Sequence, residues 1–419
     1  MARVRRRLKK KIVVGLIILL ILVCGGGGVG YYFYLEHQEE LKIIAEKALL
    51  KEIKSHYGDV VEVNKETILY EEKDGKYESV GTIGKGEVVS LEECEIDTKT
   101  KYFKIKELGY YVRYQDLKVG GEIKSRSDRY KNYLLFNENI VSKENVRLYR
   151  DGNVVYTINN SIDVPIVMKD DNGYYIEYFN ELLFVNKEDV LKTYEVSNTT
   201  LEEANGIPVT VYHFIYLAGD NSCNEQICHS DSQIREHFNY LKTNNFFTMN
   251  TTELRLYLEG KLRAPKKSIL VTIDDGARAH NFIPLLEEYK VNATLFLISG
   301  WYPAENFKSD YMELASHTHN LHTPGVCAGG QGSPLKCLDK TKLVTDLKIS
   351  RQLLNNTEAF CFPFYEYNDY GISALQEAGF KMAFIGGYRK ATRGVNLYKI
   401  PRIPLNRYTS VSQYANYIN

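Results

Sequence analysis

The sequence lacks an excess of charge of either sign, because its 419 residues carry 53 Lys and Arg against 53 Asp and Glu. A formally neutral chain argues against nucleic acid or another polyanion as the partner. The sequence also lacks the low hydrophobicity of a disordered protein, since 44% of its residues are hydrophobic. A single ordinary domain would be shorter. The composition therefore predicts a globular protein of several domains that does not bind nucleic acid.

The charges are unevenly distributed along the chain. Seven basic residues fall within residues 1–11, which leaves 46 basic and 53 acidic residues for the remainder. Residues 12–35 follow directly and include no charged side chain. A helix of about 20 residues suffices to cross the hydrocarbon core of a bilayer. We therefore expect residues 1–11 to form a basic cytoplasmic tip and residues 12–35 to form a transmembrane anchor.

This apolar segment lacks the marks of a leader that is removed. It is longer than the roughly 7–15 apolar residues of a signal peptide, and no A-x-A-like cleavage site follows it. Val23, which precedes Cys24, is bulky where a lipoprotein signal needs a small residue. Basic residues before the span and acidic residues after it place the N-terminus in the cytoplasm. We expect an uncleaved signal anchor, with everything from about residue 36 outside the cell.

Two further sequence patterns occur before residue 200. Apolar residues at spacings of three and four predict an amphipathic helix over residues 36–57, which we interpret as a stalk. Between residues 58 and 195, short alternating apolar segments separated by Gly, Asp and Asn predict β-strands.

This β-rich region contains an internal repeat. The stretch Val63 to Tyr70 is echoed by Val141 to Tyr149, and an Asp-Gly turn follows each copy. The pattern resembles bacterial SH3-like modules, which often serve secreted wall enzymes as wall-binding units or spacers. We place the two all-β modules at residues 58–122 and 130–195.

From Pro208 onward, apolar strands alternate with helical stretches. The predicted segments are 209–217, 231–243, 251–261, 268–273, 281–289 and 293–298. Alternation of strand and helix predicts an α/β domain with a parallel sheet or barrel, in which functional residues lie at the carboxyl ends of the strands.

One of these strands ends in two adjacent carboxylates. The run from Ser268 is apolar up to Ile273 and is followed by Asp274, Asp275 and Gly276. Adjacent residues at a strand end point in different directions, so one carboxylate can bind a metal while its neighbour is free to act as a base. A turn closed by Asp-Gly is the alternative interpretation.

Three of the nine histidines lie close together some forty residues later, at His317, His319 and His322. Imidazole is a common metal ligand, and one Asp with two His suits a three-ligand site that leaves a position open. Spacing alone leaves open which two bind, since His319 and His322 would share a helix face whereas His317 and His322 require a curved chain.

Three motifs together give a specific resemblance. Thr272 to Gly276 resembles the first motif of the NodB-type polysaccharide deacetylases, carbohydrate esterase family 4, and Ser316 to His322 resembles the second. Phe360 to Asn368 resembles the third, with Phe364-Tyr365 in place of the usual Tyr-Gly. The five-residue step between the two histidines is similar to the branch that deacetylates poly-N-acetylglucosamine. The resemblance covers about residues 207–419.

This resemblance implies a distorted (β/α) barrel over residues 207–419 and a divalent metal. Asp275, His317 and His322 would hold the ion, with zinc expected and cobalt or nickel as alternatives, while Asp274 would act as the catalytic base. The residues expected to contact substrate are Pro363, Phe364 and Tyr365 of the third motif and Trp301, the single tryptophan, which follows a strand end.

Two departures from the family pattern call for substitutes elsewhere in the chain. The arginine that usually precedes the third-motif proline and orients the catalytic Asp is absent, and Arg402 is the candidate that would supply its charge. No histidine follows His322 to act as the late general acid. In the poly-N-acetylglucosamine branch a Tyr-His at the end of the first strand takes that role, which points to His213.

The cysteines favour local disulfides. Cys223 and Cys228 flank one loop, and Cys327 and Cys337 flank another that is rich in glycine. In an extracellular domain two local pairs are the economical arrangement, and a structural zinc cluster is the weaker alternative.

The function that we expect is hydrolysis of N-acetyl groups on a polysaccharide that contains N-acetylglucosamine, at a Gram-positive-type cell surface. Peptidoglycan and exopolysaccharide both remain open as substrates. The alternative is an inactive, deacetylase-like protein that binds glycan or cell wall.

Overall fold

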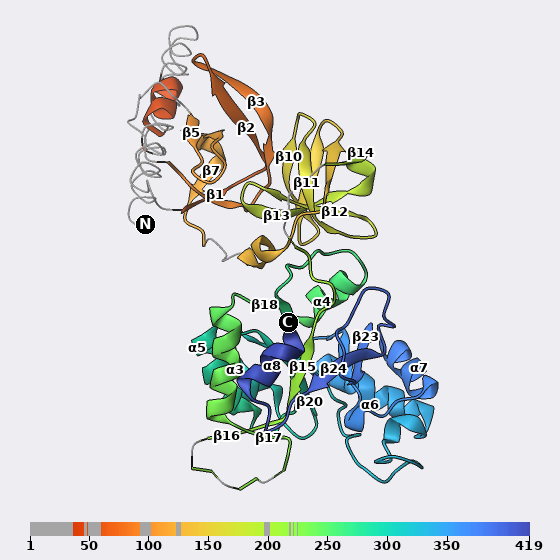
Figure 1. Ribbon diagram of the computed structural model, residues 1–419. Coiled ribbons are helices and arrows are strands. Elements are labelled where there is room, and N and C mark those ends of the chain that lie inside the picture. The colour runs from red at the N-terminus through yellow and green to blue at the C-terminus, as the bar shows by residue number, and fades with distance from the viewer. Residues whose placement is uncertain are drawn as a thin grey trace. The chain divides into compact units, whose positions relative to one another are not determined.

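The structure is a computed structural model (Figure 1). It describes residues 37–45, 48, 60–92, 102–122, 127–196, 202–217, 219–220, 222–223 and 225–419. The predicted cytoplasmic tip and anchor lie outside the described residues, as does much of the predicted stalk, of which residues 37–45 are helical. Within the described part of the chain, no helix is long and apolar enough to span a membrane.

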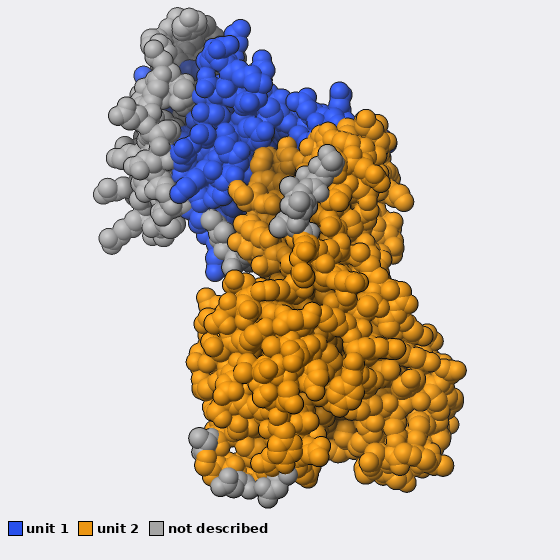
Figure 2. Space-filling view, in the orientation of Figure 1, with its two compact units in different colours: residues 1–126, 142–162 blue, residues 127–141, 163–419 orange. Residues whose placement is uncertain are grey.

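The chain divides into two compact units (Figure 2). The first comprises residues 1–126 and 142–162, and the second comprises residues 127–141 and 163–419. The region from 60 to 195 contains β1 to β14 and short 3-10 turns. Its assignment to two SH3-like modules stays a prediction.

The first unit is built from antiparallel strands. Its three-stranded sheet has the order β4-β1-β7, and β9, β10, β3, β2, β6 and β5 pair in that order. The bounds are β1 Val60–Val63, β2 Thr67–Lys73, β3 Lys76–Ile83, β4 Val88–Ser90, β5 Tyr102–Lys104, β6 Tyr111–Arg113, β7 Leu117–Val119, β9 Val146–Arg150 and β10 Asn153–Ile158. Both Asp-Gly turns have positive φ at Asp and Gly, the geometry that favours tight hairpins.

The second unit begins with further antiparallel strands. They are β8 Glu138–Ser142, β11 Asp163–Lys169, β12 Gly173–Tyr178, β13 Glu181–Asn186 and β14 Val190–Glu195. Within this unit Arg129 forms a two-pronged ion pair with the buried Glu253, at 2.8 and 2.6 Å, and Tyr133 donates a hydrogen bond to the same carboxylate. This cluster joins the segment before β8 to the α/β part of the unit.

The α/β part is a closed parallel barrel of seven strands. The order is β15-β24-β23-β22-β21-β20-β19, and β19 pairs back onto β15, so the ring closes. A short eighth strand, β18 Phe247–Thr248, extends the sheet beside β19. The ring strands are β15 Val209–Tyr212, β19 Ser268–Asp275, β20 Ala293–Leu297, β21 Met312–Ser316, β22 Ala359–Cys361, β23 Met382–Gly386 and β24 Ile400–Pro404. The expected (β/α) barrel is therefore present.

The barrel strands are buried on both faces, which explains their continuous apolar sequences. The first seven residues of β19 are all buried, and every residue of β20 is buried. Side chains from β15, β19, β20, β22, β23 and β24 meet in one buried cluster that includes Val209, Leu270, Phe296, Cys361 and Phe384. A core packed to this degree holds the strand ends at fixed positions.

Helices pack around the ring (Figure 1). They are α3 Asp231–Thr243, α4 Thr251–Leu258, α5 Ile283–Tyr289, α6 Lys340–Leu353, α7 Asp369–Ala378 and α8 Val411–Ile418. Five begin at a polar N-cap whose side chain accepts a backbone N–H: Ser230, Asn250, Asp339, Asn368 and Ser410. Each cap satisfies an N–H group that the helix itself leaves free. A separate parallel pair, β16 Phe214–Tyr216 and β17 Cys228–Ser230, follows β15.

Candidate active site

The predicted site residues gather at the carboxyl ends of the barrel strands. Asp274 and Asp275 end β19, His213 and His317 directly follow β15 and β21, and Pro363 lies two residues after β22. In parallel barrels these ends face one mouth, so residues distant in sequence meet there.

Three of them form a compact group of metal-ligand atoms. Nε2 of His317 and Nε2 of His322 each lie 3.3 Å from Oδ1 of Asp275. One ligand atom from each of the three residues, a carboxylate oxygen or a ring nitrogen, lies within 4.8 Å of the other two. One carboxylate and two imidazoles around a common point suit a divalent cation with at least one further position for solvent or substrate.

The surroundings of the two histidines fit the same cation. Nδ1 of His317 lies 2.8 Å from the carbonyl oxygen of Cys361, so this nitrogen carries the proton and Nε2 faces Asp275. Burial lowers the pKa of His322 to about 4, which leaves its ring in the neutral, metal-binding form near pH 7. Burial opposes a charged His317, yet Cys361 and Asp275 raise its pKa well above the ordinary value. The site therefore favours positive charge at this point.

The chain between the two histidines curves and is not helical. Thr318 has a φ of 77°, and the Asp346 carboxylate accepts hydrogen bonds from the backbone N–H groups of His319 and Asn320, both at 2.8 Å. Nδ1 of His319 lies 3.1 Å from the Ser299 hydroxyl. Of the two alternatives left open by spacing, the structure brings together His317 and His322.

The turn after β19 is backbone-strained. Asp275 has a φ of 76°, in the left-handed region that favours glycine. Gly276 follows at 114°, and a Cβ there would lie 2.6 Å from Leu297 and 2.7 Å from Tyr302. The glycine of the first motif thus lets the backbone approach Leu297 and Tyr302 closely. The strained Asp275 turns its carboxylate towards the histidines.

Asp274 forms a buried ion pair with Arg402. The two guanidinium nitrogens donate to the two carboxylate oxygens at 2.7 Å each, and the arginine is fully buried. Burial alone would raise the pKa of Asp274, but the Arg402 charge holds it well below its ordinary range. Cys361 lies beside the pair, with Sγ 2.8 Å from the guanidinium and 3.6 Å from the carboxylate. Asp274 is therefore an ionised, oriented carboxylate next to the metal ligands.

These contacts decide between two possible metal groups. Asp274, His317 and Cys361 also lie close enough together to share an ion. Both oxygens of Asp274 are already engaged by Arg402, however, whereas Asp275 makes no such ion pair among the described residues. The group of Asp275, His317 and His322 is therefore the better metal site.

His213 occupies the position expected for a second proton-transfer group. Its Nε2 lies 4.0 Å from Oδ2 of Asp274, and its side chain is 17% exposed. The ring thus borders both the base and solvent, as a group that contacts substrate should.

Aromatic side chains line the mouth on the side of His322. The ring of Phe364 lies 4.6 Å from that of His322, and the ring of Trp301 lies 5.8 Å from it, edge to face. Trp301 is 49% exposed, whereas Pro363 is buried. An exposed indole beside the ligands offers a flat apolar surface of the kind that sugar rings stack on.

The cysteines at the mouth are paired. Cys223 is bonded to Cys228, and Cys327 is bonded to Cys337. Cys361 is a free, buried thiol, and Cys94 lies outside the described residues.

Sequence reasoning missed two supporting residues. The cysteine pattern predicts no role for Cys361, which stands two positions before the third-motif proline, where the usual arginine is missing. Asp346 carries no local signal at all, because it belongs to α6 and reaches the histidine loop through the fold.

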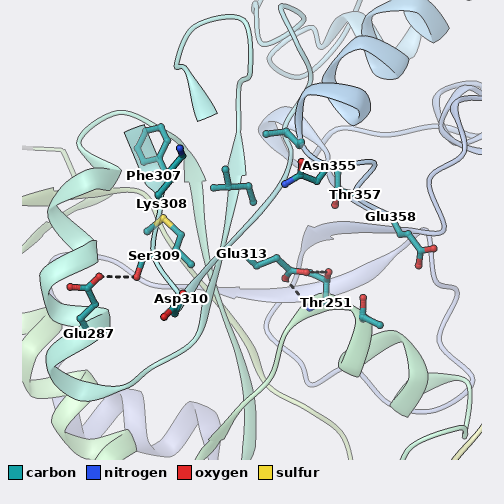
Figure 3. Close-up of a pocket in the computed structure, with 14 residues that line it drawn as sticks. Thr251, Glu287, Phe307, Lys308, Ser309, Asp310, Glu313, Asn355, Thr357 and Glu358 are labelled. Atoms are coloured by element: carbon teal, nitrogen blue, oxygen red, sulfur yellow. Dashed lines mark hydrogen bonds between the residues drawn. The ribbon is translucent and has the colours of Figure 1, made fainter. Parts of the chain in front are cut away.

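A large cavity lies at the other end of the barrel (Figure 3). It has a volume of about 820 Å³ and is lined by residues at the starts of α4 and β21. Its central carboxylate, Glu313, already accepts hydrogen bonds from the backbone and hydroxyl of Thr251 and from Thr294. The cavity is remote from the metal ligands and is not a candidate for the catalytic site.

Comparisons with known proteins agree with this geometry. Residues 261–383 match the family described as polysaccharide deacetylase. This stretch includes Asp274, Asp275, His317 and His322 but neither His213 nor Arg402.

Curated relatives match over a longer stretch. The poly-β-1,6-N-acetyl-D-glucosamine N-deacetylase of Staphylococcus aureus strain MSSA476 is 27% identical over 213 residues, which cover 46% of this chain and 72% of the relative. The protein of the same name from Staphylococcus epidermidis is 28% identical over 198 residues, 42% of this chain and 66% of the relative.

Among solved structures, a de-N-acetylase from Aggregatibacter actinomycetemcomitans covers 51% of this chain and 99% of its own, at 24% identity and a TM-score of 0.43. The family match over residues 261–383 and the curated relatives support a polysaccharide deacetylase domain in this part of the chain, a hydrolase that acts on carbon–nitrogen bonds.

Proposed function

We propose that the chain removes N-acetyl groups from a polymer of N-acetylglucosamine in a metal-dependent reaction. The observation that carries the proposal is the placement of an ionised Asp274, fixed by Arg402, directly beside the Asp275, His317 and His322 group. The names of the staphylococcal relatives support poly-β-1,6-N-acetylglucosamine as the polymer.

The residues present fit a divalent ion, which we propose to be zinc. Asp275, His317 and His322 would hold it, and such an ion, when bound, polarises a carbonyl group and lowers the pKa of coordinated water.

The remaining chemistry belongs to side chains of this protein. Asp274 accepts the proton of the attacking water, and its low pKa keeps the carboxylate available throughout the neutral range. Nε2 of His213 lies near Asp274, and His213 donates a proton to the nitrogen of the leaving amine. Trp301 and Phe364 orient the sugar at the mouth. The products are acetate and a polymer with free amino groups.

The alternative of an inactive glycan-binding protein rested on the missing arginine and the altered third motif, with the β-modules as the source of affinity. Arg402 makes a two-pronged contact with Asp274 and is fully buried, so the charge is supplied from β24. This contact favours the enzyme over the binding protein.

We also propose that the domain acts outside the cell, held by an anchor at residues 12–35. The basic cluster before that segment and the acidic residues after it support this orientation. A membrane-held deacetylase would act on polymer within reach of the surface, either exopolysaccharide or peptidoglycan.

Acetate release by the full-length protein in detergent with added zinc tests the proposal. The substrates are β-1,6-linked N-acetylglucosamine oligomers and, in parallel, N-acetylated peptidoglycan. We expect His322→Ala to lower kcat/KM by at least about 100-fold, whereas His319→Ala, in the same loop but outside the ligand group, keeps most of the activity.

Three results are informative. Turnover of the oligomers alone assigns the exopolysaccharide, and turnover of peptidoglycan alone reassigns the substrate to the wall. No metal-dependent acetate release from either polymer would overturn the enzymatic proposal.

A further inference from the structure

The backbone of the third motif adopts a conformation that its side chains disfavour. Phe364 and Tyr365 are consecutive residues with φ of 59°, in the left-handed region. A residue with a Cβ pays roughly 1–2 kcal/mol to adopt this conformation, and glycine is the usual occupant. Strain of this kind persists where the surrounding structure enforces it, and it concentrates at functional sites.

The structure makes room for the Tyr365 ring. A Cβ on Gly386 would lie 3.0 Å from two ring atoms of Tyr365, so a larger residue on β23 would displace the ring. On its other side the ring lies over the Arg402 guanidinium, whose central carbon is 5.2 Å from the ring centre. Tyr365 therefore covers the Asp274–Arg402 pair and is held in one position.

The hydroxyl group of Tyr365 has no hydrogen-bond partner among the described residues, although it is buried. Burial raises its pKa far above the ordinary value, and the charges that act on it come from Arg402, Asp274, Cys361 and Asp275, in that order. The hydroxyl is therefore a protonated donor on a ring that lies beside Arg402. A buried donor without an acceptor costs about 1–3 kcal/mol, which calls for an explanation.

Arg402, which lies beside the Tyr365 ring, and its partners are already paired with one another. The two oxygens of Asp274 receive the two nitrogens of Arg402, and the Cys361 thiol is engaged with the same pair. A substrate whose amide oxygen lay beside this hydroxyl would present an oxygen that becomes negatively charged as water attacks the amide carbon. An O–H donor fixed in advance and removed from bulk water stabilises such a charge strongly.

We propose that the Tyr365 hydroxyl donates a hydrogen bond to the acetamide oxygen of the substrate, and that this bond is strongest in the transition state. The proposal rests on the N-deacetylase function and adds a catalytic side chain to it. It also explains why a tyrosine is kept where the backbone favours glycine.

Tyr365→Phe is the direct test, because it removes one oxygen atom and keeps the ring over Arg402. In acetate-release assays of the full-length, zinc-loaded protein on β-1,6 N-acetylglucosamine oligomers, we expect kcat to fall about 100-fold and KM to change less than about threefold. The melting temperature should stay the same or rise, since the lost hydroxyl had no partner.

Tyr257→Phe is the matched control. The Tyr257 hydroxyl is also buried, but it bonds to Gly206 and Ala204 at the start of β15, away from the mouth. We expect this variant to lose stability and to keep the wild-type kcat.

A second substrate separates a catalytic role from a structural one. In oligomers with N-trifluoroacetyl groups, fluorine withdraws electron density, so the amide oxygen is a weaker hydrogen-bond acceptor. The ratio of wild-type to Tyr365→Phe rates should therefore shrink severalfold. A Tyr365→Phe variant with unchanged kcat, or one that differs only in KM, would overturn this assignment while leaving the deacetylase function intact. A wild-type protein that releases no acetate would overturn both.

Discussion

Replacement of Arg402 by methionine is the sharpest test of how the site works. Methionine fills much of the same space without a charge, so Asp274 would remain buried with no counter-ion. Only 2% of the Asp274 side chain is exposed, and water therefore cannot replace the lost guanidinium.

The expected cost follows from that burial. Removal of one partner from a buried, hydrogen-bonded ion pair typically destabilises a protein by about 3–5 kcal/mol. The pKa of Asp274, now held low by Arg402 against the effect of burial, would instead rise above its ordinary value. Buried carboxyl groups that lose their partner have raised pKa values, so at pH 7 a smaller share of the base would be ionised.

The pH dependence has a definite sign. In the wild type the folded-state pKa is depressed, so the pair stabilises the fold above the pKa of the unfolded chain and this stabilisation is lost as the pH falls. In Arg402→Met the folded-state pKa is raised, so the fold loses stability as the pH rises through the acid range. The difference between the two proteins should thus be largest at pH 7, smaller at pH 4, and lost only at still lower pH, because the wild-type carboxylate stays ionised at pH 4.

Two assays check this reasoning. Urea unfolding at pH 4 and pH 7 measures the stability difference, and acetate release from pH 6 to pH 9.5 should show activity that is at least about tenfold reduced at pH 7 and recovers at high pH. Arg129→Met is the control, because it breaks another two-pronged arginine–carboxylate pair, with Glu253, outside the mouth. It should lower stability without moving the pH profile of activity. An Arg402→Met protein with wild-type activity and stability at pH 7 would refute the argument.

The sequence predicted those helices and strands whose signals lie within the element itself. The helix expected at 231–243 is α3, with identical bounds, because a serine cap and apolar spacing both mark it. The strand expected from Ser268 is β19, since its unbroken apolar run is typical of a strand covered on both faces. The helix expected at 251–261 ends earlier, at Leu258.

Contacts that form only when the barrel closes could be proposed from the sequence, but the sequence could not show that they form. Arg402 and Asp274 are 128 residues apart and meet only because β24 and β19 both border β15 in the closed barrel. The choice between His317 and His319 as the partner of His322 was likewise undecidable from spacing, because the turn at Thr318 is shaped by Asp346 on α6. Such long-range constraints have no local signature.

The substitution of Tyr365 for glycine illustrates the opposite case. From sequence it was a departure that weakened the third motif. In the structure it is a strained residue for which Gly386 leaves space and over which Arg402 lies, so the departure stands beside the residue that pairs with Asp274. A local rule is broken here at the position where we propose a further donor, which is where such exceptions are expected.

Three further perturbations probe the site and its support. Treatment with a chelator, or Asp275→Ala, should reduce acetate release by at least about 100-fold, and zinc should restore the chelated wild type but not the variant; activity that survives chelation would contradict the assigned ligands. Removal of the Cys327–Cys337 bond by paired serine substitutions should cost about 2–3 kcal/mol in urea unfolding, and an unchanged midpoint would show that the loop needs no crosslink. The last concerns His237, whose ring is fully buried, stacks on Tyr414 and bonds to the Thr409 carbonyl. Burial lowers its pKa to about 4, so the folded protein keeps this ring neutral while the unfolded chain protonates it below pH 6.5. The contribution of His237 to the free energy of unfolding should therefore be constant above pH 6.5. It should fall by about 3 kcal/mol between pH 6.5 and pH 4. His237→Gln should be less stable at pH 7 yet lose less on acidification, and equal slopes for the two proteins would show that this histidine does not couple folding to pH.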